Sequence, residues 1–95
     1  YNPTAFAIMQ NYPNPFNPIT NVKYSIYEPS LVRISIYSVS GVWIKDLVDR
    51  YHNPGTYYAI WNSTNNNGLK VSSGVYLYKI VANDKTEIRK MLLAK

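Results

Sequence analysis

The residues that could do acid–base chemistry are few and scattered along the chain. A general acid and a general base must be held close together in a cleft. Most of the carboxylates fall in or beside predicted turns, and the last one falls on an outward position of a predicted strand. We therefore interpret all five as solvated surface charges: Glu28, Asp46, Asp49, Asp84 and Glu87.

Nucleophilic catalysis would depend on His52, which is the one histidine of the chain. A catalytic triad needs a histidine that is oriented by an acid and faces a nucleophile. Asp49 is close in sequence, but no nucleophile-elbow motif is present. A single histidine and no cysteine also exclude a His-rich metal site, a thiolate metal site and a cysteine nucleophile. The sequence predicts no catalytic residue, no metal site and no cofactor, so we expect no enzyme.

The polar loop before Gly68 resembles a calcium loop in one respect. Ser63, Asn65 and Asn67 place side-chain oxygens at alternate positions. The loop has no carboxylate and no closing glutamate, so a calcium site here would be weak. We interpret it as a polar hairpin loop, and we interpret the formal glycosylation sequon that begins at Asn62 as chance.

Aromatic side chains offer binding rather than catalysis. The chain has ten tyrosines, two tryptophans and two phenylalanines. Sugar-binding β-sandwiches stack planar rings on one exposed face, and Trp43, Tyr37, Tyr51 and Tyr58 are candidates for such rings. The alternative is that these rings cover sandwich edges or pair across strands.

The totals are those of one folded domain. The chain has 95 residues, and its hydrophobic content of 46% favours a folded domain over disorder. The net charge is +5, with a local excess of basic residues near the end. We interpret these charges as a solvated strand face, and attraction to an anionic partner is the alternative. Basic and aromatic residues are not regularly interleaved, so we expect no nucleic-acid binding.

Neither a membrane span nor a leader peptide is predicted. No run of about 18 apolar residues exists, so we expect no membrane insertion. The first four residues lack the charged and apolar regions of a signal peptide, and the chain does not begin with methionine. We therefore expect an excised or processed piece of a longer protein.

A proline-rich stretch from Asn11 to Thr20, the proline segment, organises the rest of the chain. Its three prolines fix φ, remove backbone donors and disfavour helix at the residue before each of them. The proline segment can be neither a helix nor a central strand, so we expect a stiff surface connector. Tyr12 and Phe16 are expected to press into the domain and brace it.

Beyond the proline segment, polar and apolar residues alternate with the period of β-strands. Thr20–Tyr27 and Leu31–Tyr37 are joined by a three-residue turn and are predicted to form a hairpin. No run of ten or more residues has helical periodicity with caps. Further strands are predicted at 5–9, 42–48, 56–61, 75–82 and 86–94, with Trp61 as the largest core side chain.

The middle of the chain is less regular. The apolar residues between Val42 and Val48 do not keep strict alternation, which predicts a bulge. Gly41 is expected to supply a positive φ at the preceding turn. Arg50 to Gly55 is predicted to be a loop because it contains an Asn-Pro-Gly turn signal.

The last two runs are predicted to pair. Val75–Ala82 is apolar on both faces, as in a central strand. Thr86–Ala94 is expected to pair back on it through a turn at Asn83–Lys85. Six or seven short strands separated by turns predict an all-β fold, an antiparallel immunoglobulin-like β-sandwich.

Three motifs occur in order along the chain. They are Gln-Asn-Tyr-Pro-Asn-Pro-Phe-Asn-Pro at 10–18, Ser-Gly-Val-Tyr-Leu-Tyr-Lys at 73–79 and Arg-Lys-Met-Leu-Leu-Ala-Lys at 89–95. Ile36–Gly41 and the spacing of Gly55 from Trp61 also fit. The set resembles the type A C-terminal sorting domain of proteins exported by the type IX secretion system of Bacteroidetes-like bacteria. It is similar, too, to the Ig-like domain of flagellar hook-capping proteins.

This resemblance implies a seven-stranded β-sandwich at the C-terminus of a larger secreted protein, without catalytic activity. The domain would direct the upstream cargo through the periplasm to the cell surface or the outside. The implied partners are that cargo, an outer-membrane shuttle protein and the translocon. A sortase-like peptidase is implied as a further partner, which removes the domain and links the cargo to an anionic lipopolysaccharide.

The resemblance also implies a boundary and a set of recognition residues. Residues 1–10 would be the linker and edge strand that lead from the cargo, and residues 11–95 would be the C-terminal sorting β-sandwich. The residues that the secretion machinery is expected to recognise are Pro13, Asn14, Pro15, Gly41, Gly74, Lys90, Leu92 and Lys95.

A second hypothesis stays open at this point. The chain would then be an accessory β-sandwich that binds carbohydrate or spaces domains in a secreted hydrolase. A coplanar row of exposed aromatic rings would favour this hypothesis. A bare C-terminal edge strand would favour sorting, because it offers backbone groups to a partner.

Overall fold

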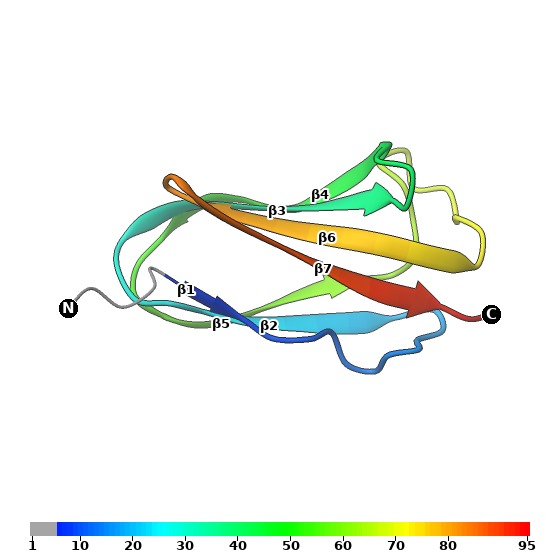
Figure 1. Ribbon diagram of the computed structural model, residues 1–95, viewed down its shortest axis with the longest axis horizontal. Helices are drawn as coiled ribbons and strands as arrows, with labels where there is room; N and C mark the ends of the chain where they lie inside the picture. The colour runs from blue at the N-terminus through cyan, green and yellow to red at the C-terminus, as the bar shows by residue number, and fades with distance from the viewer. Residues whose placement is uncertain (1–5) are drawn as a thin grey trace.

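Two antiparallel sheets pack face to face in the computed structural model, which describes residues 6–95 (Figure 1). The strand order is β1-β2-β5 in one sheet and β4-β3-β6-β7 in the other. This is the seven-stranded antiparallel sandwich that the sequence predicts. Residues 1–5, with most of the predicted linker and the first residue of the predicted edge strand, lie outside the described residues. The strands are β1 Phe6–Ile8, β2 Thr20–Ile26, β3 Ser30–Ser38, β4 Trp43–His52, β5 Gly55–Trp61, β6 Gly74–Ala82 and β7 Lys85–Leu93.

The core forms between the two sheets from alternate residues of the strands. Side chains of a strand point to opposite faces in turn, and β2, β6 and the end of β7 accordingly bury every second residue. Trp61 is fully buried, as predicted, and it lies at the centre of an aromatic group. Its ring centroid is 5.8 Å from that of Phe16 and 5.2 Å from that of Tyr76. The pattern of alternation therefore identified the buried faces of β2 and β3 correctly.

The predicted hairpin between β2 and β3 is wrong. β2 pairs with β1 and β5, whereas β3 pairs with β4 and β6 in the other sheet. The turn after Ile26 therefore carries the chain from one sheet to the other across the core. Alternation determines which face of a strand is buried, but it does not determine which strand supplies the hydrogen-bond partner.

β4 extends further along the chain than the predicted strand at 42–48, and its pairing is irregular. Its pairing with β3 shifts register between Ile34 and Ser35 and again between Ile36 and Tyr37, so the predicted irregularity is confirmed. The predicted loop at Arg50–Gly55 is wrong in its greater part, because β4 continues to His52 and β5 begins at Gly55. Only the two residues between these strands form the turn, and they carry the chain from one sheet to the other.

The last two strands form the hairpin that the sequence predicts. β6 pairs with β7 along its whole length and with β3 on its other side, so it is a central strand. Asn83 has a φ of 57° in the turn that joins the two strands. β7 lies at the edge of the four-stranded sheet, and it leads to the C-terminus at one end of the molecule (Figure 1). In residues 6–95 we find no helix with the length and hydropathy that a bilayer crossing requires.

Candidate recognition site at the edge of the last strand

The proline segment lies along the C-terminal half of β7. Phe16 is only 2% exposed, and its ring packs against Trp61. Its backbone forms a parallel bridge with Leu93. The Phe16 N–H donates to the Leu92 carbonyl at 3.0 Å, and the Ala94 N–H donates to the Phe16 carbonyl at 3.0 Å. The proline segment therefore pairs with the outer edge of the last strand.

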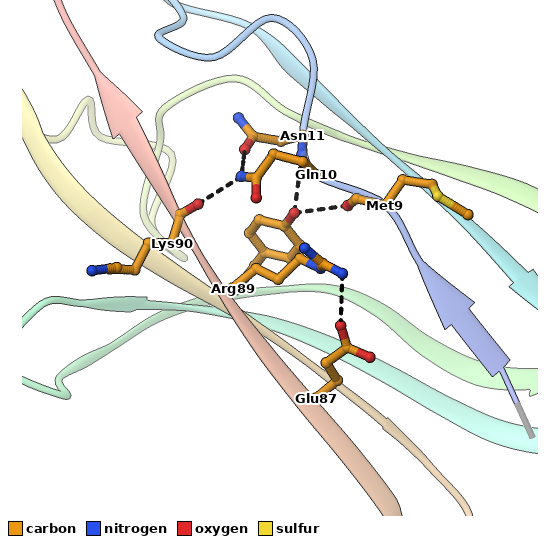
Figure 2. Close-up of polar contacts among 7 residues, drawn as sticks. Met9, Gln10, Asn11, Glu87, Arg89 and Lys90 are labelled. Atoms are coloured by element: carbon orange, nitrogen blue, oxygen red, sulfur yellow. Dashed lines mark hydrogen bonds and ion pairs between the residues drawn. The ribbon is translucent and has the colours of Figure 1, made fainter. Parts of the chain in front are cut away.

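Two amide side chains extend this pairing. Asn14 Oδ1 accepts the Leu92 N–H at 2.9 Å. Gln10 Nε2 donates to the Lys90 carbonyl at 2.7 Å (Figure 2). Gln10 Nε2 also donates to Asn11 Oδ1 at 2.7 Å. Residues from 10 to 16 thus satisfy outward backbone groups of β7 from Lys90 to the end of the strand.

Asn11 and Tyr78 hold the start of the proline segment to the core. The Asn11 N–H donates to Tyr78 Oη at 3.0 Å, and Tyr78 Oη donates to the Met9 carbonyl at 2.8 Å (Figure 2). Asn11 Nδ2 donates to Thr20 Oγ1 at 2.9 Å, and Thr20 Oγ1 donates to the Pro13 carbonyl at 2.9 Å. Burial raises the pKa of Tyr78 above its ordinary value, so the phenol stays protonated and keeps its donor.

Tyr12 does not brace the proline segment, contrary to the sequence-based expectation. Its side chain is 79% exposed. Its backbone is held instead by hydrogen bonds of 2.9 Å and 3.0 Å with the backbone of Asn21. Bracing therefore depends on the Phe16 ring and on the polar contacts of Asn11.

The N-terminal half of β7 has no strand or segment paired with its outer edge among residues 6–95. Hydrogen-bonding groups of an edge strand point alternately toward its neighbour and away from it. The outward contacts of Lys90 and Leu92 show that even-numbered residues point away from β6. Thr86 and Ile88 therefore point outward too, and among residues 6–95 no hydrogen bond from another segment reaches their backbone. Within the described part of the chain, one half of the edge is therefore covered and the other half has no partner.

The expected recognition residues Asn14, Lys90 and Leu92 come together in the structure. With Val75 and Met91 they line a shallow hollow of about 220 Å³ on the sheet beside the proline segment. Leu92 is 40% exposed. The expected residues Pro13 and Pro15 are exposed and flank Asn14 in the proline segment.

Gly74 and Lys95 lie at the same end of the sheet. Gly74 begins β6 with a φ of 150° and pairs with Leu93. The Lys95 N–H donates to Ser73 Oγ at 3.1 Å, and Lys95 Nζ donates to the Val71 carbonyl. These contacts fix the last residue against the loop that precedes β6.

Gly41 lies apart from this group, in the turn between β3 and β4. Its φ is 92°, as predicted, and its N–H donates to the Ser38 carbonyl at 2.9 Å. A Cβ atom built here would meet no atom within 4 Å, so the position demands glycine because of its backbone conformation and not for lack of space. Its structural role is to form the turn.

The charges near β7 are mostly basic. Four basic side chains and one acidic side chain lie between Lys85 and Lys95. Glu87 does not point outward as expected, because it pairs with the buried Ile80 and shares the inward face. At the margin of the sandwich it forms an ion pair of 3.0 Å with Arg89 (Figure 2). Lys85, Lys90 and Lys95 are exposed and take no part in this ion pair.

His52 is a core residue and not part of a surface loop. It is buried at the end of β4, and its Nε2 atom is 2.8 Å from Tyr24 Oη. Its Nδ1 atom is 3.1 Å from the Arg50 carbonyl, and its ring packs edge-on against Tyr57 at 4.4 Å. Both ring nitrogens are thus engaged in structural contacts. In residues 6–95 no group of three or more carboxylates and histidines is arranged to hold a metal ion.

Asp46 is half-buried and hydrogen-bonded, and not simply a solvated charge. Burial acts to raise its pKa, but two hydrogen bonds outweigh that effect and lower the pKa below its ordinary value. Ser35 Oγ donates to Asp46 Oδ1 at 2.6 Å, and Trp43 Nε1 donates to the same atom at 2.9 Å. The carboxylate therefore joins β3 to β4 on the outer face of their sheet.

The four aromatic candidates for sugar stacking do not share one face. Trp43 lies opposite Tyr37, and Tyr51 lies opposite Leu31, on the outer face of the four-stranded sheet. Tyr58 lies on the three-stranded sheet. Lys79 Nζ covers Tyr37, 5.1 Å from its ring centroid. These four rings therefore form no coplanar row.

The loop before Gly68 uses its oxygens internally. Asn65 Oδ1 accepts the N–H groups of Asn67 at 2.9 Å and of Leu69 at 3.0 Å. Gly68 has a φ of 80°, and its N–H donates to the Asn65 carbonyl at 3.0 Å. This is the tight polar turn that the Asn-Gly pair predicts.

Solved structures share this fold at low sequence identity. PorU from Porphyromonas gingivalis, crystallised as a latent dimer, aligns with a TM-score of 0.75, 18% identity and 95% of this chain covered. PorZ from the same organism, described as an essential surface component of the type IX secretion system, aligns with a TM-score of 0.60, 17% identity and 95% coverage. FlgD from Xanthomonas campestris, described in connection with the hook capping that is essential for flagellar assembly, aligns with a TM-score of 0.62, 18% identity and 95% coverage.

The chain spans 9% of the PorU chain, 11% of the PorZ chain and 62% of the FlgD chain. At these identities the likeness establishes the fold alone. A search of curated proteins found no match. Residues 10–94, which include the proline segment and the whole of β7, match the secretion system C-terminal sorting domain, and the chain belongs to that family.

Proposed function

We propose that this chain is a non-catalytic C-terminal sorting domain that directs an upstream cargo through the type IX secretion system. Family membership supports a role in secretion targeting, with a cargo that is secreted or displayed on the cell surface. In this proposal the cargo reaches the outer membrane through the periplasm. Residues 1–10 form the linker and edge strand, and residues 11–95 form the sorting domain.

The observation that carries the proposal is the state of the β7 edge. Its C-terminal half is covered by the proline segment, while the outward groups of Thr86 and Ile88 are free among the described residues. A free edge can accept a strand from a partner, because main-chain hydrogen bonds supply affinity and neighbouring side chains supply specificity. The exposed cations beside the edge favour an acidic partner surface.

We propose the outer-membrane shuttle protein and the translocon as the partners that read this edge. A sortase-like peptidase would then act at the junction with the cargo. The hollow beside the proline segment is lined by an apolar side chain, Leu92, and by a basic one, Lys90. The proposed recognition residues are Pro13, Asn14, Pro15, Gly74, Lys90, Leu92 and Lys95, with Gly41 holding the turn on the same sheet.

A fusion protein tests the proposal. A folded fluorescent reporter with a cleavable signal peptide is placed upstream of the 95-residue chain in a bacterium that has a type IX system. We expect the reporter on the surface or in the medium, and we expect it in the periplasm when the chain is omitted or the translocon is deleted. Export that does not depend on the chain, or retention despite it, would refute the proposal.

Deletion of the last seven residues is a poor test of recognition. It removes Met91 and Leu93, which are both buried in the core. Loss of export would then follow from unfolding as readily as from loss of a recognition surface. Substitution of exposed residues separates these causes.

A further inference from the structure

The N-terminal half of β7 is complementary to itself in charge. Its sequence is Lys-Thr-Glu-Ile-Arg-Lys from 85 to 90, so a glutamate and an arginine stand on either side of Ile88. Reversing the direction of the strand exchanges these two charges. When two copies lie antiparallel about a twofold axis at Ile88, Glu87 of each copy therefore faces Arg89 of the other copy.

Backbone geometry limits how two such edges can pair. The outward hydrogen-bonding groups of β7 belong to even-numbered residues, as the contacts of Lys90 and Leu92 with the proline segment show. In an antiparallel ladder, residues that exchange two N–H···O bonds lie directly opposite each other. Even-numbered residues of one copy must therefore face even-numbered residues of the other, which places the twofold axis at a residue and not between two residues.

Charge and strand length select the axis at Ile88. Opposite charges stabilise a directly opposed pair of residues and like charges destabilise it. An axis at Glu87 would oppose two glutamates and would also set Lys85 against Arg89. An axis at Arg89 would oppose two arginines. An axis nearer the start of the strand would carry the pairing past Lys85, where β7 begins and the turn precedes it.

The proline segment leaves room for this pairing. With the axis at Ile88, Thr86 of one copy faces Lys90 of the other, and the paired strand ends at Lys85. The next position along the edge is Leu92, where the proline segment takes the outward backbone groups. The Lys90 carbonyl accepts from Gln10 and has a second lone pair for the Thr86 N–H of the other copy.

The side chains that meet in this register are accessible. Ile88 is 56% exposed, so the two copies of its side chain lie together on the outer face of the joined sheet. The side chains of Glu87 and Arg89 are 40% and 37% exposed and already form an ion pair with each other (Figure 2). In the pair of strands the four charges alternate in sign around the axis.

We propose that two copies of this chain associate through β7, antiparallel and with the twofold axis at Ile88, so that their four-stranded sheets become one continuous sheet. An exposed edge strand is a ready template for pairing with another chain. This association does not depend on a role in sorting. One consequence does rest on the proposed function: the dimer covers the edge that the secretion machinery would use, so the two complexes exclude each other.

Disulfide cross-linking tests the register. The chain has no cysteine, so Ile88→Cys introduces a single thiol. Directly opposed, hydrogen-bonded residues have Cα atoms about 5.5 Å apart, which a disulfide can bridge. Two thiols give up two protons and two electrons to oxidised glutathione, which becomes two molecules of reduced glutathione. We expect Ile88→Cys to form a covalent dimer at millimolar protein concentration.

Thr86→Cys is the matched control, because Thr86 is exposed on the same face of the same strand. In the proposed register its two copies lie four residues apart along the strands, about 13 Å at 3.3 Å per residue, which is beyond the reach of a disulfide. We expect it to cross-link at least about tenfold more slowly than Ile88→Cys. No cross-linking of Ile88→Cys, or equal rates for the two variants, would overturn the proposal.

Sedimentation velocity tests the charge pairing without any cysteine. We expect Glu87→Lys and Arg89→Glu each to weaken self-association by about tenfold, because by symmetry each change creates two like-charge pairs. Mixing the two variants should restore association, since lysine at 87 then faces glutamate at 89 and the native pair is kept on the other side of the axis. Unfolding temperatures, measured alongside, show that each variant is folded.

A mixture of Asp49→Lys and Lys70→Glu is the control for overall charge, because it makes the same changes at exposed positions away from β7. Each of these variants alone should associate like the parent chain, and their mixture should associate no more strongly. A parent chain that stays monomeric at millimolar concentration would overturn the proposal. Failure of the first mixture to recover, or equal recovery and loss in the control pair, would do so too. None of these readouts uses export, so they stand apart from the test of the proposed function.

Discussion

Replacing Phe16 with alanine tests whether the proline segment is part of the folded domain. Phe16 is 2% exposed and packs against the fully buried Trp61. Truncation of a buried phenylalanine to alanine costs about 3–5 kcal/mol, because transfer free energy is lost and a cavity is left. The stability of a whole domain is about 5–15 kcal/mol. We therefore expect this single change to remove a large share of the free energy of unfolding.

Tyr12→Ala is the natural control for Phe16→Ala, since it removes an aromatic ring from the same segment. Tyr12 is exposed and is held only through its backbone, so we expect a change within about 0.5 kcal/mol. For a domain of this size the loss in Phe16→Ala corresponds to a fall in Tm of more than about 10 °C.

Urea unfolding followed by tryptophan fluorescence measures both variants, because Trp61 passes from the core into water. Native-state hydrogen exchange adds a local readout. The amides of Leu92 and Ala94 donate to Asn14 Oδ1 and to the Phe16 carbonyl, and they should lose protection in Phe16→Ala. A loss below about 1 kcal/mol, or an equal loss in Tyr12→Ala, would refute the bracing role of Phe16.

Three further predictions follow from single contacts. Tyr78→Phe leaves the Asn11 N–H and the Met9 carbonyl without their partner, so urea unfolding should show a loss of about 1–3 kcal/mol, and an unchanged midpoint would contradict this. Ser35→Ala removes a hydrogen bond to Asp46, so an NMR titration should show that the depressed pKa of Asp46 rises. Because the pKa of this carboxylate is lower in the folded state than in the unfolded state, the carboxylate stabilises the fold at pH values above its unfolded pKa. This contribution is lost as the pH falls through the folded pKa. Ile88→Pro removes an outward backbone N–H of β7 but no hydrogen bond to β6, so it should impair export of the reporter. Ile88→Ala keeps that N–H and should not impair export. Equal export by the two variants would argue against strand addition at β7.

Local pattern was enough to predict where most of the strands lie and which faces of β2 and β3 are buried. The alternation in β2 and β3 identifies their core residues because side-chain direction is a local property of a strand. The Asn-Gly pair before Leu69 and the glycine at position 41 likewise predict turns with a positive φ, a backbone conformation that few other residues adopt. The position of β7 at an edge followed from its being the last strand of a closing hairpin.

Pairing across the sandwich was not predictable in the same way. Whether β2 pairs with β3 or crosses to the other sheet depends on competition among all strands, so the expected hairpin was wrong. His52 was assigned to a loop because its neighbours are polar, although its ring fills a site between Tyr24 and Tyr57. The polar residues at the end of the edge strand β4 resemble a loop in composition, so the sequence does not distinguish the two.

The contacts that cover the edge of β7 join residues about eighty positions apart in sequence. Gln10 and Asn14 reach Lys90 and Leu92, and no local pattern announces such a pairing. The side-chain amides near the prolines were one sequence signal for this pairing. An amide side chain can both donate and accept hydrogen bonds, which suits an irregular segment that lies along an edge strand.

The most direct test of the account compares export of the reporter fusion in two double variants. Lys90→Glu with Leu92→Ser alters the exposed side chains beside the proline segment, whereas Leu69→Ser with Lys70→Glu makes the same changes in the exposed loop before β6. Both variants should fold, which their unfolding temperatures check. We predict that the first leaves the reporter in the periplasm and that the second is exported like the parent chain. Equal export by both would contradict the assignment of the β7 edge as the recognition site.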